Sequence, residues 1–208
     1  MIEQSQPTIS VIIPVYNAQH TIKRCIEAAL VSDDASVEWI VVNDGSKDAS
    51  RDVVLTFQPR VQLLDIKAGP RGPAYARNRG AEVARGDILL FVDADVVLSA
   101  GAVQRVLKTF IERPGLAAVF GSYDDNPPAP GIVSRYRNLL HHFVHQNGNP
   151  QASTFWAGCG AIRNEVFRTV GGFDEKRFLR ASIEDIELGY RLNRTGYSIL
   201  LDRDLQGS

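Results

Sequence analysis

Short apolar runs alternate with helical patterns along the first part of the chain, and this alternation restricts the fold most. The runs are rich in Val and Ile and lack polar alternation, as strands buried on both faces do. They occupy residues 8–15, 37–42, 61–66, 87–92 and 116–121. Helical spacing occupies residues 18–30, 46–57, 73–84 and 100–112. Because βαβ crossovers are right-handed, we expect an α/β fold with a doubly wound, mostly parallel sheet and helices on both faces.

The pattern changes after Tyr123, where the proline-rich loop DDNPPAPG begins. Residues 132–145 have helical spacing with a basic side, which faces water, a phosphate or an acidic acceptor. That side carries Arg135, Arg137, His141, His142 and His145. Further helices are predicted at 164–170 and 183–194, and the last residues read as a strand followed by a loop. We expect one domain over 1–208, with a nucleotide-binding half at 8–122 and an acceptor-side half at 123–208 that continues beyond Ser208.

Composition excludes several classes of protein. The 23 basic and 24 acidic residues give a net charge of -1, which provides no general attraction for nucleic acid. Cys25 and Cys159 lie far apart without metal-ligand spacing, which disfavours zinc and fits buried free thiols in a reducing compartment. No segment has the roughly 18 apolar residues that cross a bilayer, so we expect a cytoplasmic protein. The basic helix leaves peripheral association with the cytoplasmic membrane face open.

Polar residues follow three of the predicted strands at their carboxyl ends, where open α/β sheets bind ligands. The first strand ends in Pro14, Val15, Tyr16 and Asn17, the second in Asn43, Asp44, Gly45 and Ser46, and the fourth in Asp93, Ala94 and Asp95. One such cluster is explained by helix capping. Three that converge on one sheet edge predict a ligand site.

Asp93 and Asp95 are suited to Mg²⁺ or Mn²⁺, which proteins hold by one or two carboxylates together with substrate phosphates. The pair therefore points to a substrate that carries a diphosphate. An Asp-X-Asp turn also arises by chance, so the spacing alone does not establish a metal site. In the neighbouring cluster, Gly45 permits a positive φ and Ser46 is the expected N-cap of the next helix. Asp44 then either accepts a hydrogen bond from a pyrimidine base or acts as a second cap.

Five segments resemble, in order and spacing, the motifs of the inverting glycosyltransferases of family 2, which have the GT-A fold. They are VIIPVYN, VNDGSKD, ARNRGAEVARGDILLFVDAD, AGCGAIRNEVFRTVGGFDE and EDIELGYRLNRTGY. The resemblance spans residues 9–202. It implies transfer of a sugar, with inversion, from a nucleotide sugar to a saccharide, lipid-linked or other hydroxyl acceptor. A UDP-sugar is the expected donor, and Mn²⁺ or Mg²⁺ the expected cofactor.

The resemblance also implies roles for single residues. Pro14, Tyr16 and Asn17 would line the nucleoside pocket, Asp44 would hold the base, and Arg77 or Arg71 would contact the base or the phosphates. Ala94 belongs to the donor site. Asp93 would approach the ribose or the waters of the metal, and Asp95 would bind the metal directly.

The catalytic base of the family falls on the acid pair Glu184-Asp185, with Asp185 the better match. The alternative is that both acids only stabilise the N-terminus of a helix, worth about 0.3–1 kcal/mol. Trp156 and Gly158 resemble the loop that contacts the sugars, although Trp156 is equally well explained as a core aromatic. Asn43 replaces the first acid of the usual Asp-Asp pair. The motif of processive synthases is absent from the sequence, which favours transfer of a single sugar.

Three other functions fit the sequence less well. A nucleotidyltransferase would carry a glycine-rich, basic loop after the first strand, where this chain has PVYNAQHT. A dehydrogenase would carry GxGxxG at the same place. A non-catalytic sugar-nucleotide-binding module would not need all four of Asp44, Asp93, Asp95 and Asp185.

Overall fold

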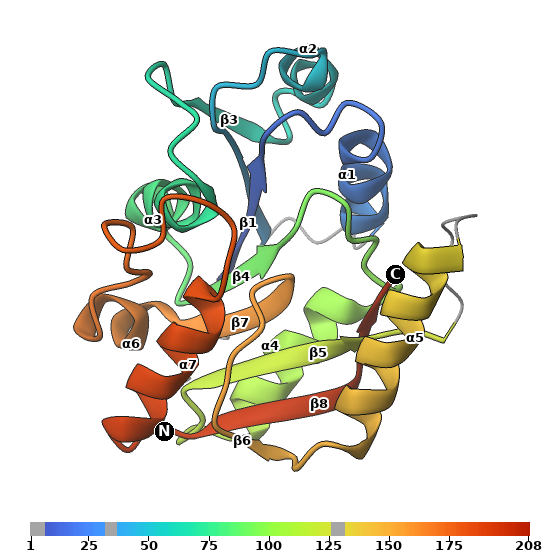
Figure 1. The fold of residues 1–208 in the computed structure, drawn as a ribbon. Helices are drawn as coiled ribbons and strands as arrows, with labels where there is room; N and C mark the ends of the chain where they lie inside the picture. The colour runs from blue at the N-terminus through green and yellow to red at the C-terminus, as the bar shows by residue number, and fades with distance from the viewer. Residues whose placement is uncertain (1–6, 32–36, 126–131) are drawn as a thin grey trace.

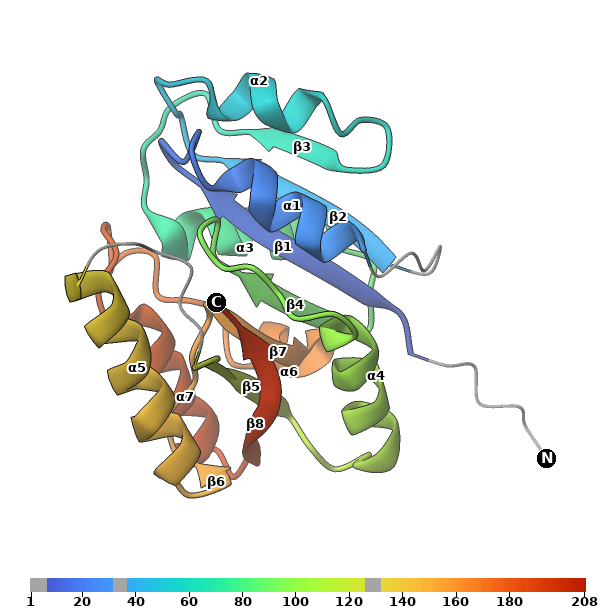
Figure 2. The same ribbon diagram turned by 90° about the vertical axis from the view of Figure 1, so that its right-hand side faces the viewer.

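The described residues form an eight-stranded sheet with helices on both faces (Figures 1 and 2). The structure is a computed structural model that describes residues 7–31, 37–125 and 132–208, without the side chains at 132–135, 137 and 141. The strands are β1 (Ile9–Val15), β2 (Val37–Asn43), β3 (Gln62–Asp65), β4 (Ile88–Val92), β5 (Ala118–Tyr123), β6 (Gln151–Ala152), β7 (Cys159–Arg163) and β8 (Ile199–Gly207). Their spatial order is β3-β2-β1-β4-β7-β5-β8-β6.

The first four strands pair as the apolar runs predict. β1 lies between β2 and β4 and is parallel to both, and β3 extends the sheet in parallel next to β2. Every residue of β4 is buried, and so is every residue of β1 except Pro14. The predicted α/β class with a mostly parallel sheet is confirmed.

Two apolar cores separate the helices by face. Side chains of α1 (Ile22–Leu30), α2 (Ser50–Leu55) and α4 (Ala102–Glu112) share one core. Those of α3 (Pro73–Val83), α6 (Asn164–Thr169) and α7 (Glu184–Arg194) share the other. The longest helix, α5 (Ile132–Asn147), packs against β5 and β8. Among the described residues, no helix is long and apolar enough to span a membrane.

Strand β7 is the main feature that the sequence patterns did not predict. It inserts between β4 and β5 and is antiparallel to both, with Cys159 opposite Val92 and Gly160 opposite Phe120. The segment before β7 therefore enters the sheet at the edge where β4 ends. The expectation of a loop at the C-terminus was wrong, because β8 continues to Gly207 and pairs in parallel with β5. The prediction of a single domain over 1–208 stays a prediction.

The expected cap at Ser46 was also wrong. Helix α2 begins at Ser50, and the Ser46 hydroxyl instead accepts a hydrogen bond from the backbone N–H of Asn17 at 3.1 Å. The Asp48 carboxylate accepts the N–H of Ser50 at 3.0 Å, which satisfies a donor at the start of the helix. Residues 43–49 thus tie the exit of β2 to the exit of β1.

Both cysteines are buried free thiols, as expected. Burial raises the pKa of each thiol to about 12, with the charges of Asp95 and Asp93 adding to the effect at Cys25 and those of Asp202 and Asp93 at Cys159. Both thiols therefore remain protonated at neutral pH.

Candidate active site

The exits of β1, β2 and β4 open into one cleft of about 1020 Å³, closed on the other side by the start of α7 and the loop before it. The predicted residues on its walls are Pro14, Tyr16, Asn17, Asp44, Arg77, Asp93, Ala94, Asp95 and Asp185. Arg71, Trp156 and Gly158 are not among its lining residues. The four acids on which the sequence interpretation depends therefore meet at a single site, although their roles are not tested by this placement.

Asp44 anchors the loop that leads into α3. Its side chain is buried, and both carboxylate oxygens accept the N–H of Arg71 at 2.9 Å, while Oδ2 also accepts the N–H of Gly72 at 2.7 Å. It does not cap α2, so the alternative reading of Asp44 as a second cap was wrong. The next residue, Gly45, has φ 70°, as expected for this turn. A carboxylate has about four acceptor sites, so Asp44 retains capacity for a ligand at the cleft wall.

Arg77 joins two walls of the cleft. Its side chain is 5% exposed; Nη2 donates to Asp93 Oδ1 at 2.7 Å, and Nη1 donates to Glu184 Oε1 at 2.8 Å. Burial lowers the pKa of Arg77, but the two carboxylates outweigh this and leave it raised. The guanidinium is thus engaged by protein acids, and its expected contact with a base or phosphate stays a prediction.

Glu184 contributes more than an electrostatic effect on α7. Its carboxylate is 5% exposed and receives, besides Arg77, the N–H of Ser182 at 2.9 Å. These contacts fix the first turn of α7 against α3. The neighbouring acid, Asp185, therefore has a defined position at the cleft wall.

Asp185 combines access to the cleft with a shifted acidity. Its pKa is raised above the ordinary 3.8, chiefly because burial desolvates the carboxylate, and the charge of Glu184 adds to this. Hydrogen bonds from the N–H groups of Ala157 and Ile186, at 3.2 and 2.8 Å, and the charge of Arg77 act in the opposite direction. A carboxylate whose proton affinity is increased in this way is suited to accept a proton from a hydroxyl.

Asp93 and Asp95 fit a divalent cation that also binds substrate phosphates. Asp95 reaches solvent, yet desolvation by the cleft walls raises its pKa, and the charge of Asp93 raises it further. This repulsion is the kind that a bound dication removes. The described residues contain no group of three potential ligands, so the protein would supply one or two carboxylates and leave the remaining positions to phosphate and water.

Trp156 is packed in the protein near the cleft without lining it. Its ring lies 4.7 Å from that of Tyr123 and 5.6 Å from that of His145. A side chain at Gly158 would place its Cβ 2.5 Å from the Trp156 ring, so packing requires this glycine. The reading of Trp156 as a packed aromatic is supported by these contacts, and contact of either residue with a sugar stays a prediction.

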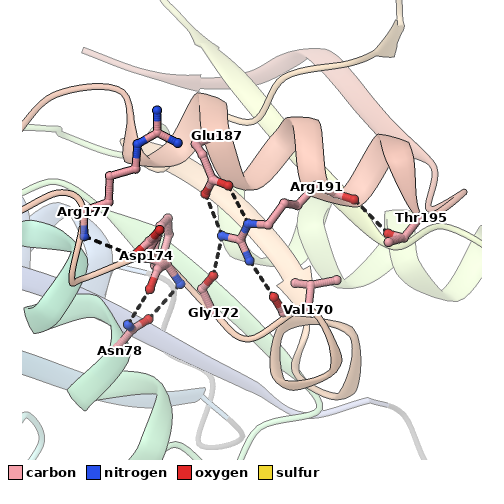
Figure 3. Close-up of polar contacts among 9 residues, drawn as sticks. Asn78, Val170, Gly172, Asp174, Arg177, Glu187, Arg191 and Thr195 are labelled. Atoms are coloured by element: carbon pink, nitrogen blue, oxygen red, sulfur yellow. Dashed lines mark hydrogen bonds and ion pairs between the residues drawn. The ribbon is translucent and has the colours of Figure 1, made fainter.

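The sequence GGFDE forms a turn, with Phe173 2% exposed. Asn78 holds it through three hydrogen bonds, two with the backbone of Phe173 at 2.9 and 3.0 Å and one to Glu175 at 2.7 Å. From the other side Arg191 donates to the carbonyl of Gly172 at 2.7 Å (Figure 3). The turn brings the Phe173 ring to 5.4 Å from the guanidinium of Arg77, so it supports the bridge between the cleft walls.

Several cleft residues were not predicted from the sequence. They lie directly before α1 and in the loop before α7, and they are His20, Thr21, Leu179, Arg180, Ala181 and Ser182. The loop has no periodic pattern or repeated residue type. The one available signal was its position directly before the acid pair Glu184-Asp185.

Solved structures of sugar transferases share this fold. The mannosyltransferase PcManGT from Pyrobaculum calidifontis, in complex with GDP-Man and Mn²⁺, superimposes with a TM-score of 0.73 at 21% identity, over 98% of this chain and 57% of that one. TarS 1–349 of S. aureus with UDP-GlcNAc gives 0.75 at 18% identity, over 96% of this chain and 57% of that one. The fold is therefore that of the GT-A glycosyltransferases.

The family follows from the sequence. Residues 10–171 match the model of glycosyl transferase family 2, and the chain belongs to this family. A validoxylamine A glucosyltransferase from Streptomyces hygroscopicus subsp. limoneus is 30% identical over 97% of this chain and 51% of its own length. The probable glycosyltransferase YdaM of Bacillus subtilis is 28% identical over 93% of this chain and 48% of its own length. The chain thus spans about half the length of the relatives it matches.

Proposed function

We propose that the cleft transfers a single sugar, with inversion, from a UDP-sugar to an acceptor hydroxyl. The observation that carries the proposal is the meeting of Asp44, Asp95 and Asp185 in one cleft, from three distant parts of the chain. Tyr16 and Asn17 line the same cleft as Asp44 and would receive the nucleoside with it. Because the chain belongs to a glycosyltransferase family, we do not propose the alternative function of a nucleotidyltransferase.

In the proposed reaction, Asp185 accepts the proton of the acceptor hydroxyl. The hydroxyl oxygen then forms a bond to the anomeric carbon from the side opposite the diphosphate. The bond between that carbon and the diphosphate oxygen breaks, and the nucleoside diphosphate leaves with the electron pair. One displacement inverts the anomeric configuration, so a single base is sufficient.

A divalent cation held by Asp95, with Asp93 beside it, would supply positive charge to the diphosphate. Among the chain's own groups, Arg180 is suited to add to this charge. It lines the cleft and has no ion pair with any described side chain, whereas Arg77 is engaged by two acids. We therefore assign the diphosphate contact to Arg180 and the positioning of the cleft walls to Arg77.

Thermal unfolding with UDP and Mn²⁺ tests the donor and the metal together. A ligand at 100 times its dissociation constant stabilises by about 2.7 kcal/mol, which corresponds to a rise in Tm of about 5–11 °C for a chain of this size. Asp95→Ala should abolish the part of the rise that depends on Mn²⁺, and Asp204→Ala, an exposed acid outside the cleft, should leave it intact. An unchanged Tm at saturating UDP would exclude a uridine donor, and the other nucleotide sugars would then be screened.

A further inference from the structure

Helix α5 exposes a stripe of large apolar side chains. Tyr136 and Phe143 are both 64% exposed, and Leu139, Leu140 and Val144 are 42%, 45% and 54% exposed. The spacing of three and four residues places all five on one side of the helix, named here the α5 stripe. An apolar stripe of a helix normally faces the core, so one that faces outward indicates a binding surface.

The opposite side of α5 is held firmly by polar and aromatic contacts. His142 Nδ1 donates to the carbonyl of Tyr123 at 2.7 Å, and Gln146 donates to the carbonyl of Arg203 at 3.0 Å. The His145 ring stacks near Trp156 and Phe120. These contacts fix the rotation of the helix about its axis, so the outward direction of the α5 stripe follows from the packing.

The charge of α5 indicates which partner would cover the stripe. The helix contains Arg135 and Arg137 and has no acidic residue in its sequence. Successive positions of a helix differ by about 100°, so the backbone positions of these arginines flank Tyr136 on either side. An apolar stripe with aromatic residues and flanking arginines is typical of helices that lie in the surface of an anionic bilayer.

A second exposed apolar site lies on the same side of the molecule. The loop before α7 exposes Leu179 by 67% and Ile183 by 51%, and Leu179 lines the cleft. Figure 2 shows this loop and the N-terminal end of α5 projecting to the same side, and Figure 1 shows them separated laterally. Because Leu179 lines the cleft, a planar surface that contacts both would lie beside the cleft.

From these observations we propose that the α5 stripe docks the protein on a bilayer that contains anionic lipid. The docking concerns binding alone and does not depend on turnover. If the proposed function also holds, an acceptor carried by the membrane would lie in front of the cleft. Because the net charge of the chain is -1, the attraction must come from the local charge of α5.

Co-sedimentation with vesicles, without donor, metal or acceptor, tests the proposal. The protein is mixed with vesicles of phosphatidylcholine alone, or of phosphatidylcholine with phosphatidylglycerol. We expect clear binding to the anionic vesicles, weaker binding to phosphatidylcholine, and weakening of the anionic binding by salt. Since no catalytic step is measured, failure here and failure of the proposed function are distinguishable.

Variants of residues on α5 separate the apolar from the charged contribution. Phe143→Ser should weaken vesicle binding about tenfold, because a large apolar side chain no longer enters the bilayer. Arg135→Gln and Arg137→Gln should each weaken binding to anionic vesicles about fivefold. Ile111→Ser is the matched control, because Ile111 on α4 is 47% exposed and lies outside the α5 stripe.

Three outcomes would overturn the proposal. The first is equal or absent binding to both kinds of vesicle. The second is binding that survives Phe143→Ser, or that Ile111→Ser reduces equally. The third is a dimer in vesicle-free buffer that Phe143→Ser dissociates, since this would assign the α5 stripe to a second copy of the chain.

Discussion

Replacement of Arg77 by Met tests whether the bridge between the cleft walls stabilises the protein. The variant leaves two acids without their partner, Glu184 at 5% exposure and Asp93 at 35%. Removal of one partner of a buried ion pair costs about 3–5 kcal/mol, because a charge remains buried and unpaired. Most of this loss falls on Glu184, since the more exposed carboxylate of Asp93 can be hydrated.

The double variant Arg77→Met with Glu184→Met removes that unpaired charge. Replacement of a buried pair by apolar side chains is often neutral, and the remaining losses are small. The N–H of Ser182 loses its acceptor at about 1 kcal/mol, and Asp93 loses its ion pair. We therefore expect the double variant to recover at least about 2 kcal/mol of the loss.

Urea unfolding followed by circular dichroism at neutral pH measures these free energies of unfolding. Arg79→Met is the matched control on the same helix, because Arg79 is 30% exposed and its pairs with Glu82 and Glu175 are worth less than about 1 kcal/mol. A loss of less than about 1 kcal/mol in Arg77→Met, or a double variant no more stable than the single one, would contradict a stabilising role of the Arg77 bridge.

Three further predictions concern Asp185, Asn78 and Gly158. Asp185→Asn should abolish transfer while UDP binding persists. Because the folded pKa of Asp185 is raised, its protonated form contributes stability that is present below the unfolded pKa and is lost as pH rises through the folded pKa. Asn should therefore be at least as stable as Asp at pH 7, and unfolding curves should show this advantage shrinking towards pH 4. Because the pKa of Asp185 is raised, the rate of transfer by the native chain should fall on the acid side at a pH above 3.8. If Asp185→Asn retains transfer with the same acid-side decline, the base is another residue. Asn78→Ala should lower the free energy of unfolding by about 2–3 kcal/mol in urea unfolding, because buried groups of the turn lose their hydrogen-bond partners. Gly158→Ala should lower it by about 1–3 kcal/mol, because the Trp156 ring must move. Full stability of either variant would contradict the packing described.

The sequence predicted the parallel half of the sheet because its strands are buried on both faces. Such strands consist almost entirely of apolar residues, so a short stretch of sequence is enough to predict them. β7 was missed because CGAIR is short and follows a glycine-rich stretch, and its place between β4 and β5 depends on pairing with distant residues.

The charges of β8 concealed the second half of the strand for a physical reason. Asp202 and Asp204 resemble loop residues, but Arg105 on α4 pairs with them at 2.7 and 2.9 Å. A partner 97 and 99 residues away makes the two acids compatible with a sheet, and no local pattern reports it.

In the candidate site, too, local features were predicted from the sequence and contacts between distant residues were not. The exits of the strands were predicted because strand ends are local features, and Asp44, Asp93 and Asp95 all lie in the cleft. The ion pair between Arg77 and Glu184 was not predicted, because the two residues are 107 positions apart in the chain. A buried arginine must find an acid, but the sequence does not tell which one.

The reversed direction of β7 also has a consequence for how this chain can be altered. Between β5 and β7 the chain forms α5 and the edge strand β6, and it returns at the start of β7 next to the end of β5, because β5 and β7 are antiparallel neighbours. Doubling the length of a segment with fixed ends costs only about 0.6 kcal/mol in chain entropy. The segment between β5 and β7 should therefore be exchangeable. Replacing it with the corresponding segment of another family member should leave the register of the remaining strands unchanged.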